Sequence, residues 1–132
     1  DTINISETEM LRIEDHTADI KLVISGDLNT IVRELVGYVL RVPEGKSSEE
    51  SFIIHIDEEY PDLFFVQLVN SIIAELEIRS VRPISYTIKE LKEFKCKLEV
   101  FYEPGQWSTN IKAATYWDLK YENNRLEIVL DI

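Results

Sequence analysis

Two segments of the chain repeat their apolar residues every three or four positions, as the buried face of an α-helix does. The first covers residues 28–40, and the second covers residues 62–78. Asp27 precedes the first segment and Asp62 opens the second. An aspartate at such a position can accept a hydrogen bond from the backbone N–H groups of the first turn. The pattern therefore predicts two amphipathic helices, capped by Asp27 and Asp62.

Alternation of apolar and polar residues predicts the strands. It is clear over residues 19–25, 52–57 and 94–102, and it is weaker over residues 84–90. In the third of these segments Cys96 falls on the apolar side. We therefore expect a buried structural thiol there, because no neighbouring residue is placed to lower its pKa and make it reactive.

A β-hairpin is predicted at the end of the chain, since Asn123 and Asn124 tolerate the positive φ angles of a two-residue turn. A turn at this position gives one apolar face and matched charges on the other face. It places Asp131 opposite Tyr116, on the side away from the apolar face. The expected apolar pairs are Tyr121 with Leu126, Leu119 with Ile128 and Trp117 with Leu130, and the charged pairs are Glu122 with Arg125 and Lys120 with Glu127.

Two amphipathic helices and about six strands indicate an α+β protein, with the helices packed on one face of a mainly antiparallel sheet. The length of 132 residues fits one domain. We place that domain at residues 10–132 and treat residues 1–9 as an N-terminal extension. We expect neither a signal peptide nor a membrane helix, which needs roughly 20 apolar residues. A lone cysteine suits a reducing compartment, so we expect the cytoplasm.

The charge of the chain limits its partners. Asp and Glu number 25 against 14 Lys and Arg, which gives a net charge of −11, and no basic run is present. Surfaces that bind nucleic acids carry clustered Lys and Arg that replace phosphate counterions. Direct tight binding to RNA or DNA is therefore not expected. Cations and basic proteins are the favoured partners, although the charge also serves solubility.

Few residues carry recognisable chemistry. The sequence has no glycine-rich phosphate loop, no nucleophile elbow and no paired Cys or His for zinc. Taken singly, each candidate has an ordinary explanation: His55 as a half-buried strand residue, His16 as a backbone partner at a strand start, and Asp19 and Asp131 as solvated carboxylates. The acidic cluster at residues 57–62 is a rival cation site, but the positive end of the second helix explains it better.

Three motifs taken together favour a functional role for these residues over the ordinary explanations. They are "EDHTADI" at residues 14–20, "NIKAATYWDLKYE" at residues 110–122 and the terminal "LEIVLDI" at residues 126–132. In combination they resemble the archease family, and the order of predicted elements agrees. The resemblance runs from about Met10 to Ile132, so it covers nearly the whole chain.

The resemblance implies an accessory protein and not an enzyme. Archeases are small acidic α+β proteins that assist the RtcB-type tRNA-splicing ligase. That ligase joins RNA ends with GTP and a divalent metal, through a guanylylated histidine of its own. Archease promotes this guanylylation and the turnover of the ligase. On this chain the resemblance implies a metal held by Asp19, Asp131 and Ile132, with His16 and Lys112 beside it or facing the partner.

The residue types agree with such a metal site. Carboxylates and a terminal carboxylate or carbonyl are hard oxygen donors, which select calcium, magnesium or manganese over zinc. Among these the resemblance implies calcium. The whole site requires that the carboxyl groups of Asp19 and Asp131 lie close enough to share one ion. The chain also departs from the family pattern, because Trp117 stands where many members have histidine.

Two other functions remain open from the sequence. The first is a metal-dependent hydrolase that uses Asp19 and Asp131, for which His16 is the only nearby general base. The second is a chaperone-like module that modulates an RNA-processing enzyme through protein contacts and needs no metal.

Overall fold

The computed structural model describes the backbone of residues 5–14 and 17–132, and the side chains of residues 19–132. Within them the chain forms seven strands and two helices. In chain order these are β1 (Ile5–Glu14), β2 (Thr17–Ser25), α1 (Leu28–Leu40), β3 (Glu50–Asp57), α2 (Pro61–Arg79), β4 (Val81–Lys92), β5 (Lys95–Pro104), β6 (Ala113–Glu122) and β7 (Arg125–Asp131).

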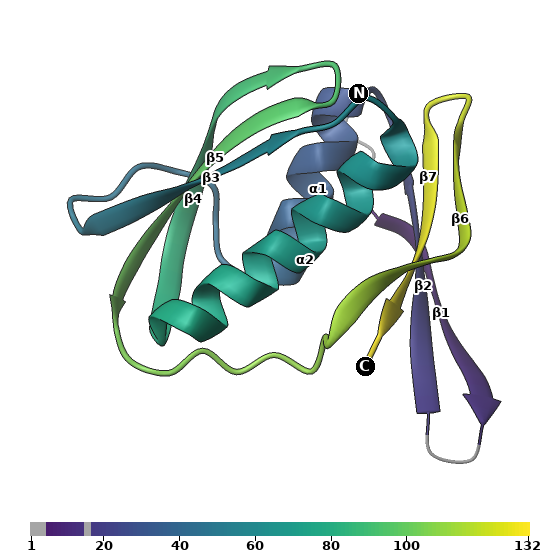
Figure 1. Cartoon of the computed structure of the whole chain (residues 1–132), viewed down its shortest axis with the longest axis horizontal. Coiled ribbons are helices and arrows are strands. Elements are labelled where there is room, and N and C mark those ends of the chain that lie inside the picture. The colour runs from purple at the N-terminus through teal and green to yellow at the C-terminus, as the bar shows by residue number, and fades with distance from the viewer. Residues whose placement is uncertain (1–4, 15–16) are drawn as a thin grey trace.

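The strands divide between two antiparallel sheets, and both helices lie between these sheets (Figure 1). One sheet has four strands in the order β1-β2-β7-β6, and the other has three in the order β3-β5-β4. The α+β class is confirmed, but the expected single sheet on one side of the helices is wrong. Alternation shows which side of a strand faces the core, and it carries no information on which strands pair.

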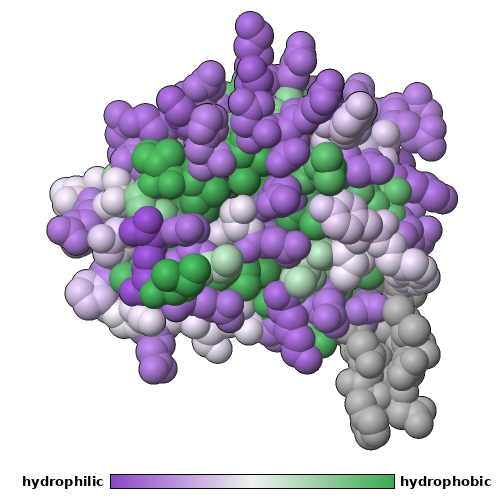
Figure 2. All heavy atoms as spheres, viewed as in Figure 1, coloured by the Kyte–Doolittle hydropathy of each residue, from purple (hydrophilic) through white to green (hydrophobic). Residues whose placement is uncertain are grey.

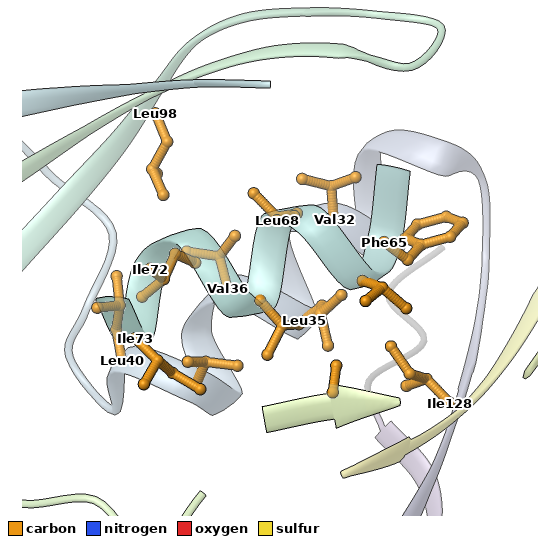
Figure 3. Packing of buried hydrophobic residues seen from close by; sticks show 14 of the residues in the cluster. Val32, Leu35, Val36, Leu40, Phe65, Leu68, Ile72, Ile73, Leu98 and Ile128 are labelled. Carbon is orange, nitrogen blue, oxygen red and sulfur yellow. The ribbon is translucent and has the colours of Figure 1, made fainter. Parts of the chain in front are cut away.

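The two helices form the centre of one hydrophobic core. In Figure 3 their side chains point toward each other, between Leu98 of β5 and Ile128 of β7. Both sheets therefore bury their apolar faces against the same helix pair. On the face seen in Figure 2, hydrophobic atoms lie over the middle, around α2, and hydrophilic atoms form most of the margin.

The two helices begin differently. The backbone N–H of Thr30 donates to the Asp27 carboxylate over 2.8 Å, so the predicted cap of α1 is confirmed. The predicted cap of α2 is wrong. Its N-cap is Tyr60, Pro61 occupies the start of the helix, and Asp62 lies in the first turn. Proline favours this start because its φ is already helical and it has no N–H to satisfy. Among the described residues, neither helix combines the length and apolar character needed to cross a membrane.

Strand β1 was not expected from the sequence. Its pairing with β2 begins at Ile5, opposite Ile24. Residues 5–9, assigned to the N-terminal extension, are thus part of a paired strand in the structure. The apolar residues of this segment do not keep one alternating phase, so periodicity could not reveal it. The boundary of the domain at residue 10 stays a prediction.

The Cys96 thiol should be unreactive in the folded protein. Its side chain is 1% exposed, and burial raises its pKa to about 11. Both effects suppress the nucleophilic thiolate at pH 8. We expect an aromatic disulfide reagent to label Cys96 only as fast as the protein unfolds, and at once in concentrated urea. Rapid labelling without urea would contradict this placement.

Candidate functional site

Asp19 and Asp131 lie directly opposite each other on the neighbouring antiparallel strands β2 and β7. Directly opposed residues point to the same side of a sheet, with ~5 Å between their Cβ atoms. The adjacent pair, Ile20 and Leu130, is part of the hydrophobic core. By alternation the two aspartates lie on the sheet face that points away from the helices. The proximity that the metal hypothesis requires is therefore present.

The two carboxylates of this pair differ in their exposure to solvent. Only 6% of Asp19 is exposed to solvent, whereas Asp131 is partly exposed. A carboxylate removed from water loses hydration, and a second carboxylate at its side adds repulsion. A divalent cation between them would relieve both costs. The donor set, made of oxygens alone, fits calcium, magnesium or manganese and does not fit zinc.

The end of β7 is anchored on two sides. The backbone N–H of Lys112 donates to the carbonyl of Asp131 over 2.7 Å, and Ala113 is its partner in the sheet. Ile132 packs its side chain against the hydrophobic core. This packing holds Ile132 next to Asp131 at the end of β7.

The protein offers few metal donors at this place. The carbonyl of Asp131 is engaged in the hydrogen bond with Lys112. Within the described ranges, no three His, Cys, Asp or Glu side chains gather closely enough to hold a metal ion. A metal here would therefore take the carboxylates of Asp19 and Asp131 and an oxygen of Ile132. The other positions of a calcium ion, which takes six to eight oxygens, fall to water or to a partner.

Asn70 of α2 holds the beginning of β6, and sequence reasoning missed it. Its side-chain oxygen accepts the backbone N–H of Ala114 over 2.7 Å, and its amide nitrogen donates to the carbonyl of the same residue over 3.3 Å. The side chain takes the place of a neighbouring strand at the free edge of the sheet. The helical pattern did not single out Asn70, because Gln67 and Ser71 are polar residues of the same run.

The β6–β7 hairpin follows the predicted register only near its turn. The pairs from Glu122–Arg125 to Lys120–Glu127 are confirmed. Beyond them the register shifts, and the next pair is Thr115 with Val129. Residues 116–119 thus form a bulge opposite Ile128. The predicted partners of Asp131 and Leu130 in the hairpin are therefore wrong, because Asp131 faces Ala113 and Leu130 faces Ala114.

The bulge contains Asp118 in the left-handed region, at φ 57°. Strict alternation continues through this segment of the sequence, so it could not reveal the extra residues. Their effect is to expose Tyr116 and Trp117, which the regular register would have paired. Bulges of this kind redirect side chains and often occur at sheet edges.

Lys21 links the bulge to the strand that carries Asp19. Its ammonium group lies 3.0 Å from Glu127 and 3.3 Å from Asp118. The hydrogen bonds with these two carboxylates, that with Glu127 first, raise the pKa of Lys21. The hydrogen bond from Lys21 lowers the pKa of Glu127 in turn. Lys21 and Glu127 are therefore both charged at neutral pH, and the lysine is drawn toward the bulge.

The structure describes each of the remaining candidates except His16. His16 lies outside the described residues. Lys112 is exposed, and its backbone N–H holds Asp131. His55 is a strand residue as expected, but it is exposed on β3 and not half-buried. Asp57, Glu58 and Glu59 lie at the β3–α2 connection, beside the β4–β5 turn.

The sequence of residues 12–132 matches the Archease protein family (MTH1598/TM1083). The chain belongs to the archease family. No curated protein matches it.

Two solved structures share the archease fold with it. The first is an archease, "possible chaperone", from Thermotoga maritima, with 24% identity over 94% of this chain and 97% of the other, and a TM-score of 0.60. The second is protein 1598 of Methanobacterium thermoautotrophicum, with 12% identity over 95% and 96% of the two chains and a TM-score of 0.55. At these identities the likeness shows the fold alone.

Replacement of Asn70 by alanine should destabilise the protein by about 1–3 kcal/mol, because the backbone groups of Ala114 lose their partner in a partly buried place. Urea unfolding followed by circular dichroism measures this difference. The matched control is Gln67→Ala, since Gln67 is an exposed amide on the same helix and should change stability by no more than ~0.5 kcal/mol. Equal effects of the two substitutions would contradict the role of Asn70.

Proposed function

We propose that this archease-family protein is a metal-binding accessory factor that activates an RtcB-type tRNA-splicing RNA ligase. In this proposal it promotes the GTP-dependent guanylylation of the ligase and its turnover, and it is not itself an enzyme. Membership of the archease family supports an accessory role. The observation that carries the metal part is the buried carboxylate of Asp19 directly opposite Asp131.

The proposed metal acts first on the structure of the chain end. A cation held by Asp19, Asp131 and Ile132 would neutralise the paired carboxylates and fix the terminal residue. Calcium is the preferred ion because it accepts a flexible set of six to eight oxygens, with magnesium and manganese as alternatives. Since the protein fills few positions, a group of the ligase can complete the coordination.

The charge of the chain supports a protein partner over RNA. A ligase that binds RNA needs a cationic surface, and a chain of net charge −11 complements such a surface. The proposal does not include direct tight binding of nucleic acid by the archease. We place this role in the cytoplasm, since a reducing compartment suits the unpaired Cys96.

Guanylylation of the ligase tests the proposal directly. With a cognate RtcB-type ligase and labelled GTP, the wild-type protein should increase the rate of enzyme–GMP formation. Asp19→Asn and Asp131→Asn should lose most of this stimulation, because each removes a charged metal donor while keeping the side-chain size. The matched control is Glu59→Gln, which neutralises an exposed acid elsewhere.

The possible results separate the proposed activities. No stimulation by the wild type would exclude the activator role. Full stimulation by both Asn variants would leave an interaction module that needs no metal. Turnover of a small phosphoester by this protein alone, abolished in the variants, would favour the hydrolase.

Calcium should stabilise the wild-type protein, because only the folded state places the two carboxylates together. At a concentration of 100 times Kd the expected gain is about 2.7 kcal/mol. Asp131→Asn should abolish this gain, yet leave the metal-free protein as stable or more stable, since it removes the repulsion with Asp19. Thermal unfolding with calcium and with a chelator measures both effects. A metal-independent melting temperature of the wild type would contradict the metal site.

A further inference from the structure

We propose that Tyr116 and Trp117, displayed by the bulge of β6, form the surface on which the RNA ligase docks, through a lysine- or arginine-bearing segment of the ligase. This inference rests on the proposed function. It adds to that function the place of contact and the chemistry of the partner's surface.

Two large aromatic side chains are exposed next to each other on β6. Trp117 is 55% exposed and Tyr116 is 53% exposed, and they follow each other in the same bulge. A bulge on a free sheet edge also prevents edge-to-edge aggregation, but charged residues or proline suffice for that purpose. Tryptophan and tyrosine are the residues that, with arginine, most often carry the binding energy of protein interfaces. Their position at an exposed edge therefore indicates a contact surface.

The bulge is held in place before any partner arrives. The Asp118 carboxylate pairs with Lys21, which reaches it from β2 on the far side of β7. On the two flanks of the bulge, the Thr115 hydroxyl donates to the carbonyl of Val129 over 3.4 Å, and Leu119 packs against the core. A contact surface that is already ordered loses less conformational entropy on binding.

The docking surface on the edge strand β6 lies near the candidate metal site, which the inner strands β2 and β7 hold. Tyr116 follows Ala113, which faces Asp131, by three positions along β6. At ~3.3 Å per residue the two places are about 10 Å apart along the strand. A protein interface of ordinary size buries about 800 Å² on each partner, which is enough to cover both. One partner can therefore contact the bulge and complete the metal coordination.

The negative charge of the chain distinguishes three possible partners for this surface: a second copy of the chain, an RNA strand and the RNA ligase. A second copy of this chain and an RNA strand are both negative, and each would be repelled by a chain of net charge −11. An RNA ligase must carry Lys and Arg to hold its substrate. These cations bind well over the faces of Trp and Tyr, and the net negative charge of the chain adds attraction. The structure thus favours the cationic ligase over the other occupants.

Affinity for the full-length ligase tests this surface. Isothermal titration calorimetry at physiological salt should show Kd raised about tenfold by Trp117→Ala and by Tyr116→Ala, in line with loss of interface anchors. Trp117→Phe, which keeps an aromatic face, should lose less affinity than Trp117→Ala. The matched control is Tyr60→Ala, because Tyr60 is 59% exposed at the start of α2 and should leave Kd unchanged. Higher salt should weaken wild-type binding.

Calcium-dependent stabilisation provides the second measurement. Both alanine variants should keep it, since the docking surface is distinct from the metal donors. Loss of this stabilisation together with affinity would mean that the substitutions distort the end of β7, and it would overturn a direct contact.

The remaining outcomes separate this inference from the proposed function. If the wild type stimulates guanylylation and the double variant Tyr116→Ala/Trp117→Ala binds the ligase equally well, the docking surface is wrong and the function stands. If the wild type neither binds nor stimulates the ligase, both are overturned. Quenching of Trp117 fluorescence by single-stranded RNA alone, or a dimer in sedimentation that the double variant abolishes, would replace the ligase as the occupant.

Discussion

The antiparallel pairing of β2 with β7 is the constraint on which the rest of the site depends. It brings residues near the two ends of the chain to one place, with Asp19 opposite Asp131. The register is fixed by the apolar residues on the other face, such as Leu22 and Ile128, which are fully buried against the helices. A shift of the strand register by one residue would turn Leu22 and Ile128 toward solvent and would turn the carboxylates of Asp19 and Asp131 toward the core. The hydrophobic core therefore positions the candidate metal donors.

This arrangement holds two carboxylates side by side on one face of the sheet, one of them nearly removed from solvent. Lys21 is close along the same strand, but Glu127 and Asp118 hold its ammonium group. The lysine is thus engaged with two other acids. In the proposed function a divalent cation offsets the repulsion, and binding is coupled to order at the chain end.

Strand β6 connects the candidate metal site with the proposed docking surface. Asn70 of α2 holds its beginning, where Lys112 contacts Asp131, and the bulge that follows exposes Tyr116 and Trp117. The Asn70 contact and the bulge both lie on β6, at the free edge of the four-stranded sheet. A regular strand would have left this edge open to pairing with other chains. The hydrogen bonds of Asn70 and the bulge at Asp118 interrupt this open edge.

Local patterns in the sequence determined the elements, and the tertiary structure decided how they meet. Helical periodicity identified both helices, alternation identified most strands, and Asn123–Asn124 located the last turn, because each signal depends on neighbours within a few residues. Asp19 and Asp131 were singled out as candidates by motif, while their contact is a product of long-range pairing. The division into two sheets, the bulge at Asp118 and the hydrogen bonds of Asn70 could not be predicted. They arise from contacts between segments far apart in the chain, which no local periodicity records.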